Sequence, residues 1–490
     1  MDNQSLGSII KSARDLMRKD AGLNTDVDRI PQLAWILFLK SFDDFEKKRS
    51  ALDKNYSEAI LKGYRWQDWA SEEDSKGNKK KVLTGEDLIK FVNDDLFPKL
   101  ASLTGSKNFE QRDVISSIFR ELNNRLMSGH VLRQIVNLVN NVNFVSTDDI
   151  HTMAKLYEDM LVEMRDAAGS NGEFYTPRPV IRFIVEQIKP DLTKSEKVLD
   201  PACGTGGFLV ESLEYMKKDE KSKPLQKKLR YETLYGIEKK PMPYLLGMMN
   251  MLLHEVDKPN IARANTLSKP LREITENDQY DVIITNPPFG GEEESGISSN
   301  LPVGMQTSDT ALAFLLYIMY TLKQNGRCGI ILPNGPMFAG GIAAKIKEKL
   351  LNEFNLHTII RLPNSVFAPY TGIATNILFF DKKGKTKEIS YYQMKLAETI
   401  KAYNKTNPMS YDNFSDVIKW MKTRKENGNA WKVKVEDIKE FNLDIKNPND
   451  VEVTQNLSPH ELIDTILKDE EKTIELLKEV KKLIDKEIPK

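Results

Sequence analysis

Short apolar runs alternate with longer amphipathic stretches from about residue 166 onward, and this alternation restricts the fold more than any other feature of the chain. The stretches between the runs, such as 243–256, have the apolar spacing of helices. The strand candidates are KVLD (197–200), TLYGIE (233–238), DVIIT (281–285), RCGIILP (327–333) and TNILFFD (375–381). Strands that alternate with helices form a largely parallel sheet covered on both faces. The sequence therefore predicts an α/β domain whose ligand lies beyond the carboxyl ends of the strands.

The regions on either side of this pattern are expected to be helical. Residues 1–165 contain apolar positions at helical spacing, for example Ile9, Ile10, Ala13 and Leu16. Residues 401–490 are rich in Lys and Glu and have few strand signals. We therefore predict three parts: an N-terminal helical domain (1–165), an α/β domain (166–400) and a C-terminal helical region (401–490).

Charge and cysteine content exclude several classes of protein. Lys plus Arg and Asp plus Glu each total 71, so a chain of this kind could hold nucleic acid only through local basic clusters or a basic partner. Two distant cysteines and five scattered histidines argue against a disulfide framework and against a metal site. A reducing, cytoplasmic location is expected. No signal peptide is evident, and the longest apolar stretch, 311–322, is too short to span a membrane.

Two stretches suggest a nucleotide-like ligand. In DPACGTGGF (200–208) a strand ends at an acid and leads into a glycine-rich turn, where a ligand can approach the backbone. The turn is not a phosphate-binding P-loop, and Leu209 occupies the place of the third glycine of the dinucleotide motif. Glu238 ends the next strand, where an acid can bind both hydroxyls of a ribose. The alternatives are an ordinary strand-to-helix turn and a surface acid.

A third stretch, Asn286-Pro287-Pro288-Phe289, follows the strand 281–285. The prolines restrict the backbone, so the carbonyl groups beside them have fixed directions. An Asn amide oxygen and a backbone carbonyl together can accept both hydrogens of one NH2 group, and the Phe ring offers a flat face. These groups suit a planar heterocycle with an exocyclic amine. The alternative is a rigid turn without a binding role.

Together these motifs resemble those of a known enzyme family. DPACGTGGF is similar to the cofactor motif of S-adenosylmethionine-dependent methyltransferases, and NPPF to the catalytic motif of DNA adenine-N6 methyltransferases. GEFYTPRPV (172–180) resembles a further cofactor motif that precedes the glycine turn. Their order, behind a helical N-terminal region, resembles the modification (M) subunit of type I restriction-modification systems. The resemblance implies a Rossmann-like methyltransferase sheet with a helical N-terminal domain and a C-terminal helical tail.

The resemblance also implies roles for individual residues. The segment ahead of the sheet would flank S-adenosyl-L-methionine with Glu173, Phe174, Tyr175, Thr176, Pro177 and Arg178. The glycine turn would line its methionine and sugar with Asp200, Ala202, Gly204, Thr205, Gly206 and Gly207. Glu238 would bind the ribose hydroxyls and Asn265 would lie near the adenine ring of the cofactor. Asn286, Pro287, Pro288 and Phe289 would hold the target base, and no metal is implied.

The expected mechanism follows from the chemistry of the target amine. The lone pair of adenine N6 is delocalised into the ring, and two acceptors, Asn286 Oδ1 and the Pro287 carbonyl, would localise it toward the methyl group. Phe289 would stack on the base after it leaves the duplex. The alternatives are a solitary adenine methyltransferase that reads DNA through residues 1–165, a related enzyme acting on protein glutamine or RNA guanine, and a scaffold without activity.

The chain has no evident region that reads bases, and the resemblance supplies partners for this task. It implies double-stranded DNA as substrate, a specificity (S) subunit bound by two M subunits, and a restriction (R) subunit. In the C-terminal region, apolar residues near a heptad seam predict a helix that docks on the S subunit. They are Ile463, Ile466, Ile474, Leu477, Val480 and Ile484, and Glu470 and Thr473 interrupt the seam. The alternative is a surface helix packed on its own domain.

Overall fold

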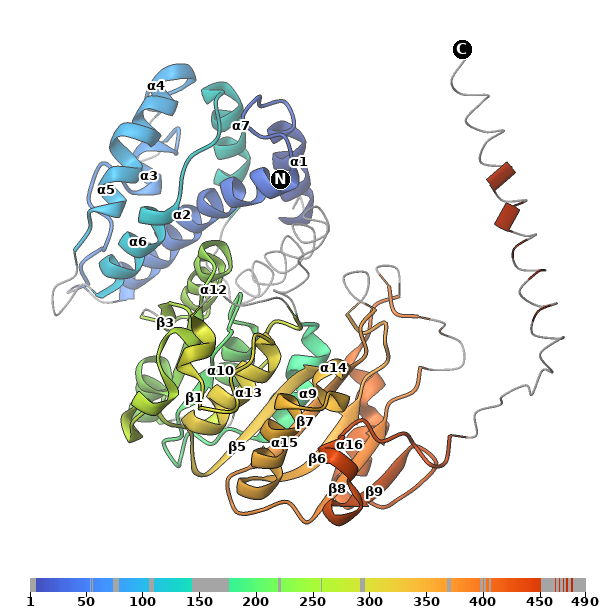
Figure 1. The fold of residues 1–490 in the computed structure, drawn as a ribbon. Helices are drawn as coiled ribbons and strands as arrows, with labels where there is room; N and C mark the ends of the chain where they lie inside the picture. The colour runs from blue at the N-terminus through green and yellow to red at the C-terminus, as the bar shows by residue number, and fades with distance from the viewer. Residues whose placement is uncertain are drawn as a thin grey trace.

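The structure is a computed structural model of the 490-residue chain. It describes residues 6–52, 54, 56–73, 79–104, 110–142, 176–218, 222–256, 258–290, 296–367, 372–396, 400, 402–404 and 407–450, and the separate positions 463, 467, 470, 473, 474, 477 and 478. Figure 1 shows a helical N-terminal part above an α/β part built on one sheet.

The N-terminal part is a bundle of helices, as expected from its apolar spacing. Its elements are α1 (Leu6–Met17), α2 (Asp26–Leu52), α3 (Trp66–Trp69), α4 (Gly85–Lys90), the π-helix η1 (Phe91–Leu96), α5 (Phe97–Ala101), α6 (Glu110–Glu121) and α7 (Gly129–Asn140). The long helix α2 is the centre of the bundle, and Trp35 on it is fully buried, with its ring edge-on to Phe97 at 5.1 Å. The predicted helical region from 143 to 165 lies outside the described residues.

The α/β part contains a nine-stranded sheet in the order β3-β2-β1-β4-β5-β7-β6-β8-β9. The strands are β1 (Val198–Asp200), β2 (Leu234–Glu238), β3 (Asn260–Arg263), β4 (Tyr280–Thr285), β5 (Leu322–Pro333), β6 (Asn355–Arg361), β7 (Thr375–Asp381), β8 (Glu388–Gln393) and β9 (Ala430–Lys434). The first five in spatial order are parallel, whereas β7 runs antiparallel to both β5 and β6. The five predicted strands are all present, and the sequence analysis missed β3, β6, β8 and β9.

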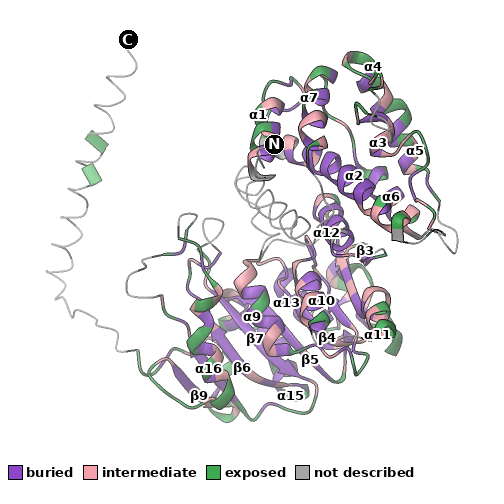
Figure 2. Ribbon diagram, turned by 180° about the vertical axis from the view of Figure 1, so that it is seen from behind, coloured by how far each residue is buried: buried purple, intermediate pink, exposed green. Residues whose placement is uncertain are grey.

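Helices cover both faces of the sheet, and alternate residues of a strand enter different cores (Figures 1 and 2). In β7, Ile377 and Phe379 belong to one core, and Leu378 and Phe380 belong to the other. The first core receives α9 (Arg178–Ile188), α10 (Gly207–Lys217), α12 (Pro241–Leu253) and α16 (Ser415–Thr423). The second receives α13 (Thr310–Thr321) and α15 (Ile342–Glu353). The sheet is therefore buried on both sides, as the apolar strand sequences predict.

The expectation for residues 401–490 needs correction. Strand β9 pairs antiparallel with β8 and completes the sheet, so the α/β part continues beyond residue 400. Helix α16 packs Trp420 against Tyr392 of β8, with ring centroids 5.0 Å apart. The charged composition hid this strand, because β9 lies at the edge of the sheet and its last three residues are exposed Lys432, half-buried Val433 and exposed Lys434.

Farther on, residues 463, 467, 470, 473, 474, 477 and 478 are helical. Four apolar side chains among them are exposed: Ile463 (56%), Leu467 (56%), Ile474 (50%) and Leu477 (63%). Ile466, Val480 and Ile484 of the predicted seam lie outside the described residues. Considering the described residues alone, none of the helices has the length and apolar character needed to cross a membrane.

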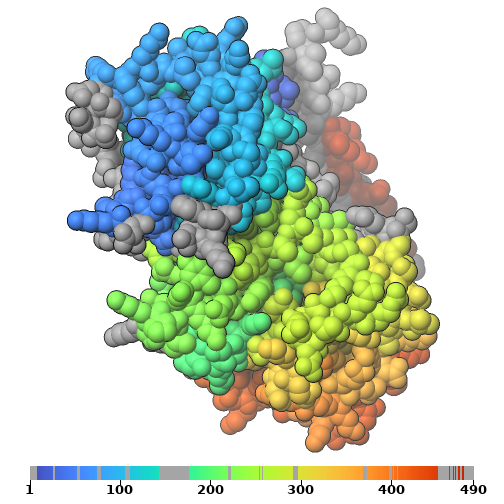
Figure 3. All heavy atoms as spheres, turned by 90° about the vertical axis from the view of Figure 1, so that its left-hand side faces the viewer, coloured from blue at the N-terminus to red at the C-terminus, as the bar shows by residue number. Residues whose placement is uncertain are grey.

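Helix α12 joins the two parts of the molecule. It contacts both α2 and α6 of the N-terminal bundle. The hydroxyls of Ser117 on α6 and Tyr244 on α12 lie 3.1 Å apart, and Arg263 at the end of β3 forms an ion pair with Glu121. Figure 3 shows the N-terminal helices seated directly on this side of the α/β part. The N-terminal bundle therefore rests on the half of the sheet that contains β1, β2 and β3.

Candidate functional site

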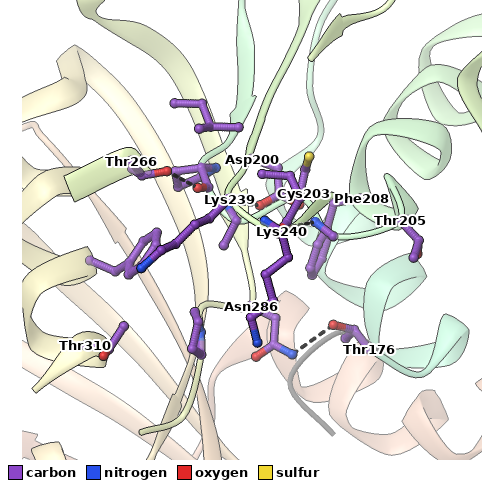
Figure 4. Close-up of a pocket in the computed structure, with 18 of the residues that line it drawn as sticks. Thr176, Asp200, Cys203, Thr205, Phe208, Lys239, Lys240, Thr266, Asn286 and Thr310 are labelled. Atoms are coloured by element: carbon purple, nitrogen blue, oxygen red, sulfur yellow. Dashed lines mark hydrogen bonds between the residues drawn. The ribbon is translucent and has the colours of Figure 1, made fainter. Parts of the chain in front are cut away.

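A cavity of about 240 Å³ opens at the carboxyl ends of β1, β2 and β4 (Figure 4). Its lining comes from every motif that the sequence analysis singled out. The lining residues are Thr176, Arg178, Ile181, Asp200, Pro201, Ala202, Cys203, Gly204, Thr205, Gly207, Phe208, Ile237, Glu238, Lys239, Lys240, Asn265, Thr266, Asn286, Pro288, Gly290, Thr310 and Phe314. One cavity thus connects the glycine turn with the Asn-Pro-Pro-Phe turn.

The glycine turn takes its shape from one left-handed glycine and from the close approach of helix α12. Gly206 has φ +77°, a left-handed conformation that favours glycine, and it caps the start of α10. Gly247 on α12 faces the turn so closely that a Cβ atom there would lie 2.9 Å from the carbonyl oxygen of Gly204. The amide of Asn250, one turn farther along α12, donates to the carbonyl of Thr205 at 3.0 Å. Helix α12 therefore supports the glycine turn from outside the cavity.

Glu238 ends β2 and holds the backbone on both sides of the cavity. Its Oε2 accepts from the N–H of Gly204 at 3.0 Å, and its Oε1 accepts from the N–H of Lys240 at 2.7 Å. The side chain is only 7% exposed. Burial raises the pKa of this carboxyl, and the backbone donors partly oppose the rise. An acid in this position is suited to bind a ligand that supplies hydrogen-bond donors.

Asp200 links the end of β1 to the end of β4. Its Oδ1 accepts from the Thr285 hydroxyl at 2.7 Å and from the N–H of Ala202 at 3.1 Å. The carboxyl is 1% exposed, and burial raises its pKa to about 7, with a further contribution from the charge of Glu238. Two buried acids beside one cavity make the site attractive to a ligand that carries positive charge.

The Asn-Pro-Pro-Phe turn begins with an amide that uses only one of its two ends. Asn286 Nδ2 donates to Thr176 Oγ1 at 2.9 Å (Figure 4). Asn286 Oδ1 is buried, and among the described residues it has no hydrogen-bond partner. Leaving a buried acceptor unpaired costs about 1–3 kcal/mol. A ligand with an N–H group at this place would remove that cost.

The other residues of the turn differ in their surroundings. Pro288 lines the cavity, whereas the buried Pro287 and the half-buried Phe289 are not part of its lining. The Phe289 ring packs edge-on against Phe367, with centroids 5.1 Å apart and an interplanar angle of 88°. This contact fixes the ring in one orientation.

The remaining predicted residues fall into three groups. Glu173, Phe174 and Tyr175 lie outside the described residues. Pro177 caps α9 and Gly206 caps α10, and neither is part of the lining. Arg178 lines the cavity, donates to the carbonyl of Gly207 at 3.5 Å, and has a pKa lowered by burial. Asn265 also lines it and caps a short helix through the N–H of Leu267 at 3.0 Å.

Three residues that matter for the site were missed in the sequence. Thr285 was treated only as the end of a strand, and Gly247 and Asn250 only as members of an apolar helix. A glycine and an asparagine within PYLLGMMNMLL interrupt an otherwise apolar helix, and this is the signal that could have identified them. No comparable signal distinguishes Thr285, because a Thr is common in a buried strand.

Within the described part of the chain, His, Cys, Asp and Glu side chains do not gather in a group of three that could hold a metal ion. The described residues of the cavity offer hydrogen-bond acceptors, buried carboxylates and apolar side chains such as Phe208, Pro288 and Phe314. This set suits a nucleotide-like ligand and a planar base that meet in one cavity.

Comparisons with known proteins identify the family of this chain. A family model described as the HsdM N-terminal domain matches residues 6–139, and one described as N-6 DNA Methylase matches residues 148–456. The chain is 44% identical over 470 residues to the EcoEI methylase subunit of a type I restriction enzyme from Escherichia coli, which covers 94% of this chain and 93% of that protein.

Two solved structures are similar over nearly the whole chain. One is a modification subunit assigned to a type I restriction enzyme of Vibrio vulnificus YJ016, with a TM-score of 0.83 and 48% identity, covering 92% of this chain and 98% of that one. The other comes from work on the assembly and conformational transition of a type I restriction-modification system, with a TM-score of 0.78 and 37% identity over all of both chains. The resemblance seen in the sequence motifs is thereby confirmed. The chain belongs to the N-6 DNA methylase family and, within it, to the methylase subunits of type I restriction-modification enzymes.

Proposed function

We propose that this chain transfers the methyl group of S-adenosyl-L-methionine to N6 of adenine in double-stranded DNA, as the modification subunit of a type I complex. The unpaired, buried Oδ1 of Asn286 carries this proposal, because it offers an acceptor for an exocyclic amine. It lies in the same cavity as the buried acids Asp200 and Glu238, which suit a cationic cofactor.

The residues of the glycine turn fit the cofactor. The turn admits a ligand against its backbone, and Glu238 stands at the end of the neighbouring strand, where it can accept from both ribose hydroxyls. Asp200 lies deeper, between the glycine turn and Thr285, and its charge would favour the cationic end of the cofactor. When bound, the cofactor supplies a methyl group activated by its positive sulfur. Asn265 and Arg178 would complete the walls of this half of the cavity.

The residues of the Asn-Pro-Pro-Phe turn would prepare the target amine. Asn286 Oδ1 and the Pro287 carbonyl would accept one N–H each, which draws the N6 lone pair out of conjugation and toward the methyl group. Pro287 and Pro288 hold these acceptors in place before the base arrives, so little reorganisation is required. Phe289, held by Phe367, would stack on the base after it has left the duplex. The amine would lose one proton to water as its bond to the methyl group forms and the bond between the methyl group and sulfur breaks, with the electron pair of that bond going to sulfur.

The test uses the full chain assembled with its specificity subunit and cofactor that carries a radiolabelled methyl group. We expect label in N6-methyladenine of duplex DNA. We expect no label in duplexes in which unsubstituted purine, which lacks the exocyclic amine, replaces the target adenine. Transfer to protein glutamine or RNA guanine would support the alternative substrates, and cofactor binding without any transfer would support the scaffold. The match of residues 6–139 to the HsdM N-terminal domain favours a type I subunit over a solitary enzyme.

The exposed apolar side chains of the C-terminal helix indicate that it binds a protein partner. Ile463, Leu467, Ile474 and Leu477 follow at intervals of four, seven and three residues, which places them on one side of a helix. We propose that this side packs on helices of the specificity subunit, with two such chains for each specificity subunit and a restriction subunit in the larger complex. The cytoplasmic location stays a prediction. The division of the chain into 1–165, 166–400 and 401–490 also stays a prediction, and its boundary at residue 400 must move beyond β9.

Replacing Glu238 by Ala should weaken cofactor binding by about 10²- to 10⁴-fold. The change removes two hydrogen bonds to a charged acceptor, each worth about 1.5–3 kcal/mol. Isothermal titration calorimetry with S-adenosyl-L-methionine measures the effect. Glu232→Ala, which removes an exposed acid shortly before β2, is the matched control and should bind normally. Unchanged affinity in a folded Glu238→Ala protein would contradict the role of this acid.

Cofactor affinity should rise with pH because Asp200 has a pKa of about 7 in the free protein. Below that pH the buried carboxyl holds a proton, which a cationic cofactor must displace, so binding should be about tenfold tighter at pH 8 than at pH 6. Burial also raises the pKa values of Glu238 and of the Cys203 thiol, which lie beside Asp200.

Asp200→Asn should remove most of this pH dependence. The cofactor's own amine titrates in the same way with both proteins. The difference between the wild type and Asp200→Asn in how cofactor affinity changes with pH therefore isolates Asp200. Calorimetry at pH 6, 7 and 8 in buffers of different ionisation enthalpy counts the released protons. Equal slopes in the two proteins would show that Asp200 does not titrate on binding. For the free protein the sign is reversed: the contribution of Asp200 to folding stability is present at low pH and is lost as the pH rises through about 7.

A further inference from the structure

We propose that the ring of Phe338 enters the DNA duplex beside the target adenine and stacks in the space that this base leaves. The inference rests on the proposed function and adds a residue that helps the base to leave the duplex. Phe338 is the last residue of α14 (Asn334–Phe338), a short helix that follows β5. Its side chain is 56% exposed, and of all the aromatic side chains that the structure describes it is the only exposed one.

Helix α14 lies at the edge of the sheet where the cavity opens (Figure 1). Strand β5 runs parallel to β4, so the two strands end at the same edge, and β4 leads directly into Asn286. The N–H of Asn334, the first residue of α14, donates to the carbonyl of Ala374 at 2.9 Å, just before the start of β7. The exposed ring and the Asn-Pro-Pro-Phe turn therefore follow neighbouring strands at one edge of the sheet.

The backbone on both sides of Phe338 is fixed by a buried lysine. Lys347 of α15 is 1% exposed, and its Nζ donates to the carbonyls of Met337 and Ala339 at 2.7 and 2.8 Å. The Met337 carbonyl also accepts from the N–H of Leu443 at 2.9 Å. A buried ammonium group is costly unless acceptors surround it, so this arrangement resists movement. The ring is thus held on a rigid support, and little order remains to be gained when a partner binds.

The segment around the ring suits the approach of DNA. No acidic residue occurs from Asn334 to Lys347, and Lys345 is exposed. A Cβ atom on Gly335 or Gly340 would meet none of the described residues within 4 Å, so packing inside the chain does not require glycine at either place. Small residues and the absence of negative charge leave room for a phosphate backbone close to the ring.

An exposed aromatic ring offers what a flipped base takes away. When a base leaves the duplex, its stacking on the neighbouring bases is lost, and this loss opposes flipping. An apolar side chain that enters between bases offsets part of the loss, and an aromatic ring stacks on any base because every base has a flat face. Such a contact does not depend on sequence, which fits a chain whose recognition of bases is assigned to a specificity subunit.

The test compares Phe338→Ala with Phe338→Trp, which keeps an aromatic face. The full chain is assembled with its specificity subunit and cofactor, and single-turnover methylation is measured on two duplexes. In one the target adenine is paired with thymine, and in the other it lies opposite cytosine, where less free energy is needed to release it. Relative to the wild type on the same duplex, Phe338→Ala should lose about tenfold or more on the paired target and only a few-fold on the mismatched one. Phe338→Trp should keep most of the rate.

Two controls separate base release from other effects. Val303→Ala removes a side chain that is 94% exposed in the segment between β4 and α13, and it should keep the wild-type rate on both duplexes. Cofactor affinity of Phe338→Ala should change less than twofold.

An alanine variant with a normal rate, or with equal losses on the two duplexes, would overturn the proposal. Loss of co-purification of Phe338→Ala with the specificity subunit would also overturn it, because the ring would then contact that protein. The proposed function fails separately, if the wild-type complex transfers no methyl group to adenine in either duplex.

Discussion

Replacing Asn286 by Ala should lower the rate of methyl transfer by at least about 10²- to 10³-fold and leave cofactor affinity nearly unchanged. Removal of a single preorganised hydrogen-bonding group that acts on the reacting atoms costs about this much in other enzymes. The Asn286 amide donates to Thr176, and among the described residues it forms no hydrogen bond with the glycine turn. Single-turnover methylation and calorimetry with the cofactor measure the two effects.

Asn286→Asp is the informative companion variant. A carboxylate keeps an acceptor oxygen toward the cavity, and the Thr176 hydroxyl can donate to the other oxygen. This variant should therefore retain more activity than Asn286→Ala, although both proteins lack the original amide. Turnover of Asn286→Ala within a few-fold of the wild type would refute the proposed mechanism. Thermal unfolding of each variant establishes that the fold is intact.

Truncation after about residue 455 should abolish assembly with the specificity subunit and leave cofactor binding intact. Among the described residues, the cavity lining ends at Phe314 and the sheet ends with β9 at Lys434, both well ahead of the cut. Burial of one large apolar side chain contributes about 1.5–3 kcal/mol, so four of them exceed the roughly 4 kcal/mol of a thousandfold change in affinity. Co-purification and binding of DNA with the recognition sequence measure the loss.

A subtler variant tests the face of the helix rather than its presence. Replacing Ile463, Leu467, Ile474 and Leu477 together by Gln keeps good helix-forming residues while removing the apolar side chains. Replacing the exposed Glu470 and Lys478 by Gln is the matched control and should assemble normally. If the truncated chain still assembles and still protects its DNA site, the docking surface lies elsewhere.

The predictable part of the fold was the part with the strongest local signal. Strands β1, β2, β4, β5 and β7 are apolar and mostly buried, and the sequence identified all of them. Strand β3 has only Ile261 buried among its four residues, and β9 is a charged edge strand, so neither shows a clear period. Their identity depends on pairing with β2 and β8, and this pairing is a property of the folded chain.

The candidate site divides in the same way. Gly204, Glu238 and Asn286 were predicted because each lies in a short motif with chemical meaning of its own. The contacts that join the motifs were not predictable, since Thr285 meets Asp200 across 85 residues and Asn286 meets Thr176 across 110. A single sequence contains no record of such distances. Thr176 illustrates the difference, because its motif suggested the cofactor and its hydrogen bond leads to the amide.

The position of α12 has a consequence for how the two parts of the molecule communicate. This helix contacts α2 and α6 on one side, and on the other Gly247 and Asn250 touch the glycine turn. A ligand that favours one position of α12 must therefore alter the free energy of its contacts with the N-terminal bundle. Thermodynamic linkage makes this relation reciprocal: whatever displaces the bundle changes the affinity of the glycine turn by the same factor. If ligand binding shifts α12, occupancy of the cavity and the placement of the N-terminal helices cannot change independently.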